Sequence, residues 1–438
     1  QAFVQALRDP AAWAGGRLPN PVRMRVGAAA ESTARRAAGL PARYDLRLEA
    51  RLTPVKDQAQ YNTCWAFANV AALESSLLGL QPPELWDLSE DNLVSRSGFG
   101  PFLAGLYQYG GYDAMAVAYF TRWAGPVDEG DDPYPSRTPP AVNVARKHVQ
   151  DVVMLPGRAS AGDNDLLKRL VMEYGGVSVG MYWDPDGEAF DSATGSYYAP
   201  GINQENHGVA IVGWDDAYGA AEFGGGLGEP PGDGAYLVRN SWGTGFGDGG
   251  YFYVSYYDLS FAFSDCTAYT RVDAPGVYRK VYQYDRLGLV EARRLSGVGD
   301  PSTARFANRF TANRTQRVVA AGFYATAGGA SYTVFAGPSF TQLSARGSGT
   351  LELPGFHTVP LTTPLRVVKG RRFVVAVKLT TPGAEPLPIE RPRLPYSSLA
   401  SASPGQSYVK SPTSRWYDLT SLKGMSEANV CLKAYAVD

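Results

Sequence analysis

The chain has 438 residues, of which 45% are hydrophobic and 19% are charged, as is typical of a globular protein that buries more than one core. Its 41 basic residues nearly balance its 42 acidic ones, and the formal net charge of −1 gives no reason to expect nucleic acid as a partner. The sequence also lacks a transmembrane segment, because no apolar run approaches the roughly twenty residues that span a bilayer.

The first forty residues are rich in alanine, arginine and proline. Residues 18–22, Leu-Pro-Asn-Pro-Val, are expected to be stiff and extended, because each proline fixes its own φ and pushes the preceding residue toward an extended conformation. The chain begins at Gln1 rather than methionine, which is consistent with a removed signal peptide.

A lone cysteine then opens a predicted helix. After Thr63, apolar residues recur at three- and four-residue spacing and should share one buried face; they are Ala66, Phe67, Val70, Leu73, Leu77 and Leu78. Cys64 would lie in the first turn, where unpaired N–H groups and the helix dipole favour the nucleophilic thiolate. Gln58, six residues earlier, adds an amide donor. Taken alone, Cys64 could also be a buried structural cysteine.

Further along, Gly110 and Gly111 form a stretch of bare backbone. A peptide could approach this backbone closely and pair with it as a strand, although an ordinary turn is the alternative.

The chain has three histidines, so the search for a general base is short. His148 lies in a charged stretch that we expect to be helical and solvated. His357 lies far downstream. His207 follows Asn206 and opens an apolar run over residues 208–214 that is typical of a buried strand, where a neutral core histidine is the alternative.

Another short strand is predicted over residues 236–239, and it ends at Asn240. The amide of Asn240 can accept a hydrogen bond from an imidazole N–H and so fix the tautomer and orientation of the ring. Trp242 would shield that hydrogen bond from water.

Together these blocks resemble the papain family of cysteine peptidases. The resemblance implies that Cys64 is the nucleophile, His207 the base, Asn240 the orienting amide and Gln58 the oxyanion-hole side chain, and the distance along the chain from Cys64 to His207 falls in the family's range. Other family blocks follow in order at residues 88–90, 110–112, 132–135 and 177–179.

The same resemblance assigns substrate binding to Gly110, Gly111, Asn206, Trp242 and Gly180. Gly180 stands where the family usually has a larger apolar side chain, in the pocket for the second residue before the cut, so we expect a roomy pocket. No cofactor is required for the catalysis that the family performs.

The expected fold is therefore α+β, with three parts. Residues 1–40 would be a leader or pro-segment, and residues 41–275 a papain-like domain with a helical lobe and a β-barrel-like lobe. The extended stretch at 18–22 is expected in or beside the groove near Cys64 and Gly111, where it would hold a zymogen closed. After residue 275, short alternating strands at 318–324, 331–336 and 372–379 predict a β-sandwich over residues 276–438.

The second half resembles the lectin-like domain of bacterial papain-type peptidases, such as the clostridial cell-wall enzymes that process surface-layer protein. This resemblance makes a carbohydrate or cell-wall ligand and a structural calcium ion options, with no metal ligands identified. Trp416 and Tyr417 could stack on a sugar ring, although aromatic residues in sandwich strands are more often core.

Two further cysteines, Cys266 and Cys431, are too few for a disulfide framework, and we expect both to be unpaired. The sequence thus predicts a secreted or cell-surface cysteine endopeptidase that acts on proteins or peptides. An exopeptidase of the same fold and a non-catalytic adhesin that uses the sandwich are the alternatives.

Overall fold

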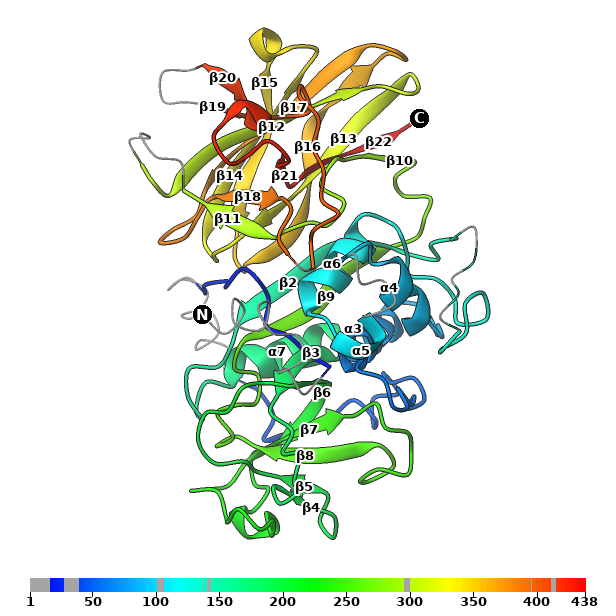
Figure 1. Ribbon diagram of the computed structural model, residues 1–438, viewed down its shortest axis with the longest axis vertical. Coiled ribbons are helices and arrows are strands. Elements are labelled where there is room, and N and C mark those ends of the chain that lie inside the picture. The colour runs from blue at the N-terminus through cyan, green and yellow to red at the C-terminus, as the bar shows by residue number, and fades with distance from the viewer. Residues whose placement is uncertain are drawn as a thin grey trace.

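The computed structural model describes residues 16–26, 39–100, 106–136, 138, 140, 143–294, 300–394, 396–410 and 415–438. Figure 1 shows a strand-rich upper body, formed by the second half of the chain, above a lower body in which helices pack against strands. No helix among these residues is long and apolar enough to cross a membrane.

Helix α3 (Cys64–Leu78), which begins at the predicted nucleophile, is the central element of the lower body. It contacts α4 (Glu90–Arg96) and α6 (Asp113–Thr121) as well as strands of the main sheet, and α5 (Leu106–Tyr109) lies beside α4. The spacing predicts one buried face, but within α3 only Ser76 and Leu78 are not buried. Packing on several sides explains this difference, and it holds Cys64 rigidly at the start of the helix.

A 13-stranded sheet runs through both bodies. Its peptidase-side strands, in hydrogen-bonded order, are β2 (His148–Pro156), β9 (Asp265–Asp273), β3 (Val177–Met181), β6 (His207–Asp215), β7 (Ala235–Arg239), β8 (Tyr251–Ser255), β5 (Ser196–Tyr197) and β4 (Phe190–Asp191), with β1 (Arg43–Asp45) on β6. Helix α7 (Asp165–Tyr174) packs on β3, β6 and β9.

The expectation for His148 was wrong. His148 is buried at the start of strand β2 rather than on a solvated helix, and its ring stacks on Trp123 with 3.8 Å between centroids. These residues form a strand because the mostly aliphatic stretch that follows, from Val149 to Leu155, supplies side chains that favour a buried sheet.

The second half forms the expected β-sandwich. One layer continues the long sheet with β16 (Gly355–Val367), β13 (Gln316–Ala325), β22 (Leu432–Val437) and β10 (Lys280–Tyr282). The other layer is β15 (Ser344–Leu351), β14 (Ala330–Gly337), β17 (Arg372–Thr380), β12 (Thr303–Thr311), β19 (Ser407–Lys410) and β20 (Trp416–Asp418). A small sheet joins β11 (Glu291–Arg293), β18 (Leu387–Glu390) and β21 (Asn429–Val430), and the short 3₁₀ turns are η2 (Ala220–Glu222), η3 (Phe340–Gln342) and η4 (Leu419–Ser421).

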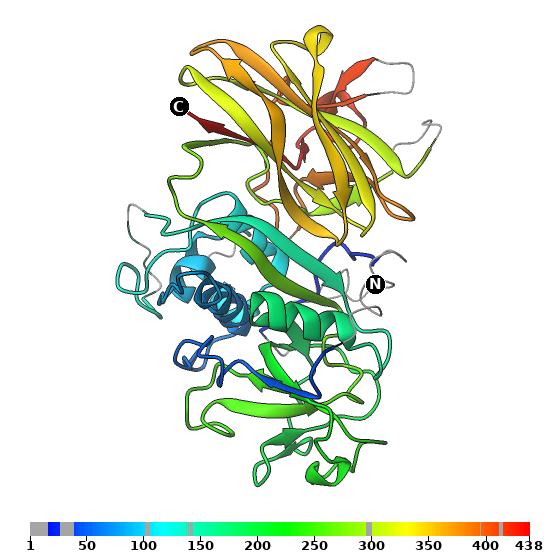
Figure 2. The same ribbon diagram turned by 180° about the vertical axis from the view of Figure 1, so that it is seen from behind.

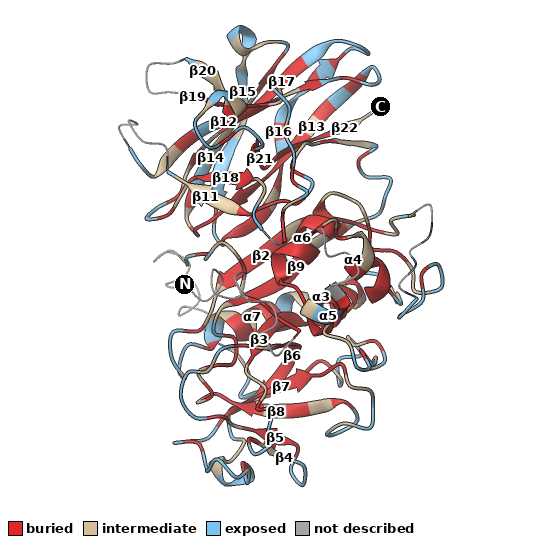
Figure 3. Ribbon diagram, viewed as in Figure 1, coloured by how far each residue is buried: buried red, intermediate tan, exposed pale blue. Residues whose placement is uncertain are grey.

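The sandwich core comes from alternate residues of the facing strands. Phe306 and Phe310 of β12 and Phe373 of β17 meet Val318 and Phe323 of β13 in one buried cluster. Figure 3 shows this burial as red segments along the inner strands. The strands predicted over residues 318–324 and 372–379 thus contribute to this core, together with β12, which was not among the predicted strands.

The two bodies share main-chain hydrogen bonding where β16 meets β2. Gly355 pairs with Val153 and Phe356 with Val152, and the view from behind in Figure 2 shows the strands running on from one body to the other. The side chain of Asp151 also accepts a hydrogen bond from the Thr358 amide at 2.9 Å.

Residues 16–26 run from the lower body to the sandwich. Arg17 forms a parallel bridge with Gly111, and Arg25 forms another with Ala327 in the turn after β13. This described part of the leader, drawn in dark blue in Figure 1, is therefore bonded to both bodies. The expected cut near Leu40 would follow residues 27–38, which lie outside the described residues.

Candidate active site

Cys64 lies in the first turn of α3, as the sequence predicts. Its side chain is buried, with the residue 1% exposed, and its sulfur accepts a hydrogen bond from the backbone N–H of Gly208 at 3.2 Å. Burial raises the pKa of the thiol to about 11, against the lowering effect of that N–H and of the Arg17 charge. In this state the thiol is therefore protonated at neutral pH.

His207 begins β6 and is oriented by Asn240 at the end of β7. The imidazole Nε2 lies 2.8 Å from Asn240 Oδ1, and the same oxygen accepts from the backbone N–H of Ser241 at 2.9 Å. Because Ser241 N can only donate, that atom of Asn240 must be the amide oxygen and Nε2 must carry the proton. Nδ1 is then the basic nitrogen of the ring. Burial lowers the pKa of His207 to about 4, so the ring is neutral.

Aromatic side chains cover this hydrogen bond. Trp242 stacks on His207 with 4.7 Å between ring centroids, and Trp183 packs edge-on against Trp242 at 4.7 Å. The backbone of Trp183 is in turn held by the Asn206 side chain, which donates to its carbonyl and accepts from its N–H. The shield around His207 thus comes from two loops, of which the sequence predicted only that of Trp242.

The Gln58 side chain is buried beside the same cleft wall. Its Oε1 accepts from Ser241 Oγ at 2.6 Å and its Nε2 donates to the Tyr61 carbonyl at 2.6 Å. A primary amide has two N–H donors, so one proton of Nε2 is left for a substrate oxygen.

The leader pairs with the glycines that were predicted to bind substrate. Gly111 N donates to Gly16 O at 3.2 Å, Leu18 N donates to Gly111 O at 2.8 Å, and Arg17 N donates to the Asn206 carbonyl at 3.2 Å. A Cβ on Gly16 would lie 2.5 Å from the sulfur of Cys64, so this backbone passes directly over the thiol. Of the stretch predicted to lie here, residues 18–22, Leu18 pairs with Gly111, while Gly16, just before that stretch, is the residue that lies against Cys64.

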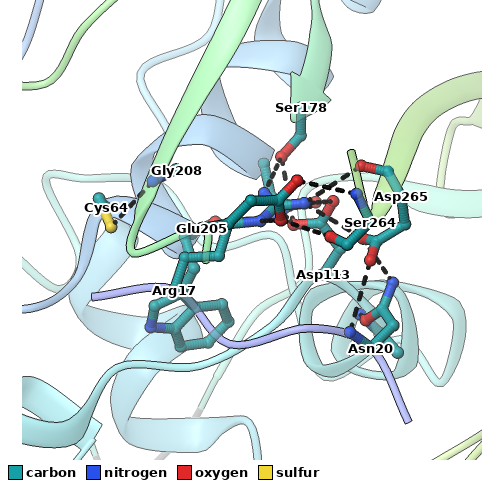
Figure 4. Close-up of polar contacts among 12 residues, drawn as sticks. Arg17, Asn20, Cys64, Asp113, Ser178, Glu205, Gly208, Ser264 and Asp265 are labelled. Carbon is teal, nitrogen blue, oxygen red and sulfur yellow. Dashed lines mark hydrogen bonds and ion pairs between the residues drawn. The ribbon is translucent and has the colours of Figure 1, made fainter. Parts of the chain in front are cut away.

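The Arg17 side chain enters the pocket that Gly180 lines. It is 0% exposed and contacts Asp113, Ser178 and Asp265, as Figure 4 shows. A Cβ on Gly180 would lie 2.8 Å from Arg17 Nε and 2.2 Å from the carboxylate of Glu205. The missing side chain at 180 thus leaves room for these charged groups.

Sequence reasoning missed the acidic residues of this pocket and Trp183. Asp113 follows the Gly110-Gly111-Tyr112 block directly, and Glu205 directly precedes Asn206 and His207. Their positions beside recognised blocks are the signal that could have found them. Asp265 stands beside no such block.

Three residues that the sequence singled out, Cys266, Cys431 and His357, lie outside the cleft. Cys266 and Cys431 are free and buried, as expected. His357, in β16, donates a hydrogen bond from Nε2 to the Leu353 carbonyl at 3.0 Å. Among the described residues no group of three or more His, Cys, Asp or Glu could hold a metal ion.

The arrangement supplies each part of a thiol-based acyl transfer: a thiol at a helix start, a neutral imidazole with a fixed tautomer, and amide donors nearby. The comparisons with known proteins agree with this chemistry. Residues 40–271 match the model of the papain family cysteine proteases, and residues 281–436 match that of the lectin-like domain.

Individual relatives match in the same way. A cysteine protease of Blomia tropicalis is 32% identical over 53% of this chain and 66% of its own length, and cathepsin K of Gallus gallus is 34% identical over 48% of this chain and 58% of its own. The chain therefore spans less than two thirds of either of these relatives.

Among solved structures, the clostridial cysteine protease Cwp84 after propeptide cleavage matches with a TM-score of 0.77 and 27% identity, over 90% of this chain and 98% of that one. A structure of the protease and lectin-like domains of Cwp84 from Clostridium difficile, described as a surface layer associated protein, covers all of this chain and 96% of its own at a TM-score of 0.80 and 24% identity, which shows the shared fold. The chain belongs to the papain family of cysteine proteases and carries a lectin-like domain after its peptidase region.

Proposed function

We propose that this protein is a secreted cysteine endopeptidase that is held inactive by its own leader. The observation that carries this proposal is the leader backbone lying over Cys64, with Gly16 against the sulfur and Arg17 and Leu18 bonded to Asn206 and Gly111. A segment in this position excludes any other peptide from the same groove.

Catalysis would proceed through a covalent acyl-enzyme. The thiol proton of Cys64 passes to Nδ1 of His207, and the sulfur forms a bond to the scissile carbonyl carbon. The amide of Gln58 and the N–H of Cys64 would hold the developing oxyanion. The imidazolium then gives its proton to the leaving amine as the C–N bond breaks.

Deacylation reverses these roles. His207 takes a proton from water as the water oxygen forms a bond to the acyl carbon, and the C–S bond breaks to restore the thiol. Asn240 keeps the ring in the required tautomer throughout, because its oxygen is already fixed by the Ser241 N–H.

Release of the leader would change the protonation of this pair. The thiol pKa is high because the cleft is covered, and exposing the sulfur removes that desolvation while leaving the N–H groups at the helix start in place. The name of the solved relative, which refers to propeptide cleavage, supports a zymogen of this kind. Its sister structure, described as surface layer associated, supports a place outside the cell.

The test is labelling by the epoxide thiol trap E-64, followed by digestion of a denatured protein and sizing of the products. We expect one equivalent of label on Cys64 once the leader is displaced, and internal cleavage to mixed lengths. Cys64→Ala should abolish both, while Cys266→Ala is the matched control because it also removes a buried thiol. Hydrolysis by Cys64→Ala would contradict the mechanism, and products shortened only from one end would indicate an exopeptidase.

The sandwich aromatics give less support to a sugar site. Trp416 packs on Phe340 with 5.1 Å between ring centroids and has Lys410 over its face, so its ring already contributes to the packing of β20. A cell-wall or carbohydrate ligand for this domain stays a prediction from the resemblance.

A further inference from the structure

The pocket occupied by Arg17 is built from acidic residues that come from three separate elements. Asp113 is the first residue of α6, Glu205 precedes β6, and Asp265 is the first residue of β9. Arg17 binds Asp113 in a fork, with Nη1 to Oδ1 at 3.0 Å and Nη2 to Oδ2 at 3.1 Å. Asp265 Oδ2 lies 3.1 Å from Nη2 and Glu205 Oε2 lies 4.0 Å from Nε.

Two of these carboxylates have partners that belong to the peptidase domain. Asp113 also accepts hydrogen bonds from Asn69 and Ser178, and Glu205 accepts from the backbone N–H groups of Phe263 and Ser264. These bonds hold both side chains in place whether or not the leader is present. The pocket is therefore a preformed acidic site and not an arrangement that Arg17 creates.

Asp265 differs because it faces the leader with both oxygens. Its Oδ2 accepts from Arg17 and, at 2.7 Å, from Asn20 Nδ2, while its Oδ1 lies 3.4 Å from Asn20 N. When the leader leaves, this buried carboxylate loses these donors. The Ser264 side chain remains as a partner of Asp265, but a buried carboxylate that has lost its cation is costly, so the empty pocket favours a ligand that brings a cation back.

We infer that the mature enzyme selects substrates with an arginine side chain in this pocket, which by the family resemblance accepts the second residue before the scissile bond. This inference rests on the proposed peptidase function and adds the substrate class. Three carboxylates face one cation, so the site repels acidic side chains. An apolar side chain in the pocket would leave these buried carboxylates without a cation to pair with. Lysine should be accepted less well, because an ammonium cannot reproduce the two parallel bonds to Asp113.

The titration of the pocket agrees with its geometry. Burial raises the pKa values of both Glu205 and Asp265 above the ordinary carboxyl range, and the Arg17 guanidinium opposes that rise. Other groups that interact with Arg17 are Asp113 from α6 and Cys64 from α3, and His207 feels the same cation. A bound guanidinium thus favours the charged forms of Glu205 and Asp265 against the effect of burial.

The first test uses the full chain and needs no activation step. Arg17→Leu keeps a side chain of useful size but removes the charge, and Arg17→Lys keeps the charge but removes the fork. The readout is the rate at which iodoacetamide alkylates Cys64. We expect Arg17→Leu to raise that rate by at least about tenfold and Arg17→Lys to raise it less. Rates equal to the wild type for Arg17→Leu would overturn the inference, because an apolar side chain would then fill the pocket equally well.

The second test measures substrate choice after the full chain has been processed. Two fluorogenic peptides are compared, benzyloxycarbonyl-Arg-Arg and benzyloxycarbonyl-Leu-Arg aminomethylcoumarin, which differ only at the position in question. We expect kcat/KM to favour the Arg-Arg peptide by at least about tenfold, and Asp265→Asn to lower kcat/KM for the Arg-Arg peptide and so remove most of that preference. Asp273→Asn, at the far end of the same strand, is the matched control.

The outcomes separate this inference from the proposed function. If E-64 did not label Cys64 and no peptide were hydrolysed, the proposed peptidase function would be contradicted. Efficient hydrolysis with equal or greater kcat/KM for the Leu-Arg peptide would leave the peptidase intact and overturn only the arginine pocket. If Asp265→Asn does not fold, the ratio of kcat/KM for the two peptides is measured in the wild type and in Asp113→Asn instead. A wild-type preference for the Arg-Arg peptide that Asp113→Asn reduces supports the arginine pocket, and a wild type without that preference overturns it.

Discussion

Cys64 and His207 are both buried in this structure, which favours their uncharged forms. Burial raises the pKa of Cys64 and lowers that of His207, so both groups are neutral over a wide range around pH 7. The hydrogen bond from Gly208 to the sulfur is compatible with this state. In the proposed zymogen, latency would therefore be chemical as well as steric, since the nucleophilic thiolate would be scarce while the leader is bound.

Alkylation of the thiol as a function of pH should report this directly. In the full chain we expect slow reaction of Cys64 with iodoacetamide at neutral pH, with the rate rising toward the thiol pKa of about 11. In Arg17→Gln the same profile should shift to lower pH, because the sulfur regains solvent. Peptide mapping by mass spectrometry separates Cys64 from the buried Cys266 and Cys431. Identical profiles in the two proteins would contradict a leader effect on the thiol.

Gln58 gives a second prediction at the site. Gln58→Ala should lower kcat by about 10² to 10³, because it removes one donor to the oxyanion while Cys64 and His207 remain. E-64 should still label Cys64 in this variant, although at a lower rate. Its matched control is Gln342→Ala in η3, a glutamine of the sandwich. A wild-type kcat in Gln58→Ala would mean that its bonds to Tyr61 and Ser241 are its whole role.

The residues of the candidate active site could be singled out from the sequence because each lies in a short block with its own neighbours, such as Asn206 before His207. The acidic pocket as a whole could not, because Asp265 stands beside no such block and only the fold brings it together with Asp113 and Glu205. His148 shows the reverse error. Charged neighbours suggested a solvated helix, while the strand and its stacking on Trp123 depend on a distant aromatic residue.

At the scale of elements, the leader is held by polar contacts with buried partners as well as by the burial of Leu18 and Met24. Besides the Arg17 fork, Asn20 Oδ1 accepts from the Ala114 N–H at 2.8 Å at the start of α6, and Arg25 bonds to residues 326 and 328 beside the sandwich. Its proline-rich stretch was recognisable as stiff and extended from the sequence. Its partners were not, because a sequence pattern does not say which groove an extended segment enters.

Acid should loosen this segment. The cation of Arg17 makes the pKa values of Asp265 and Glu205 lower in the leader-bound pocket than in the empty pocket. The ion pairs therefore stabilise the bound leader fully at a pH above the pKa values of the empty pocket. This stabilisation is lost as the pH falls through the pKa values of the leader-bound pocket. Because burial raises both values, this loss begins at higher pH than for exposed carboxylates.

Hydrogen exchange of the Leu18 amide, which is bonded to Gly111, measures this release. Protection, corrected for the intrinsic rate, should fall between about pH 8 and about pH 4 in the wild type. Arg17→Gln should show weaker protection that depends less on pH. Protection that rises as the pH falls would contradict the assigned ion pairs.

For the molecule as a whole, the pairing of β16 with β2 joins the two halves through main-chain hydrogen bonds. The change in strand texture after residue 275 predicted a separate β-sandwich, and that sandwich is present. Its joining to the peptidase sheet was not predictable, because the junction involves only Gly355 and Phe356 pairing with Val153 and Val152. Two residue pairs leave no periodic signal in a sequence.

Gly355 tests this junction. Its φ is 143°, and a Cβ there would lie 1.9 Å from the Val152 carbonyl oxygen, so Gly355→Ala must push β16 away from β2. We expect a loss of about 3 kcal/mol or more in stability and a separation of the thermal transitions of the two bodies. Gly370→Ala is the control, since its φ of 77° is also positive but a Cβ would meet nothing within 4 Å. It should cost about 1 to 2 kcal/mol and leave the transitions together.

The way the leader is held also bears on what cutting the chain can achieve. Every contact described for residues 16–26 is noncovalent, so cleavage after this segment does not by itself empty the groove. It turns a tethered segment, present at a fixed effective concentration, into a free peptide whose occupancy depends on how much of it remains nearby. Freshly cut enzyme should therefore be inhibited by its own fragment when concentrated, and should become active on dilution.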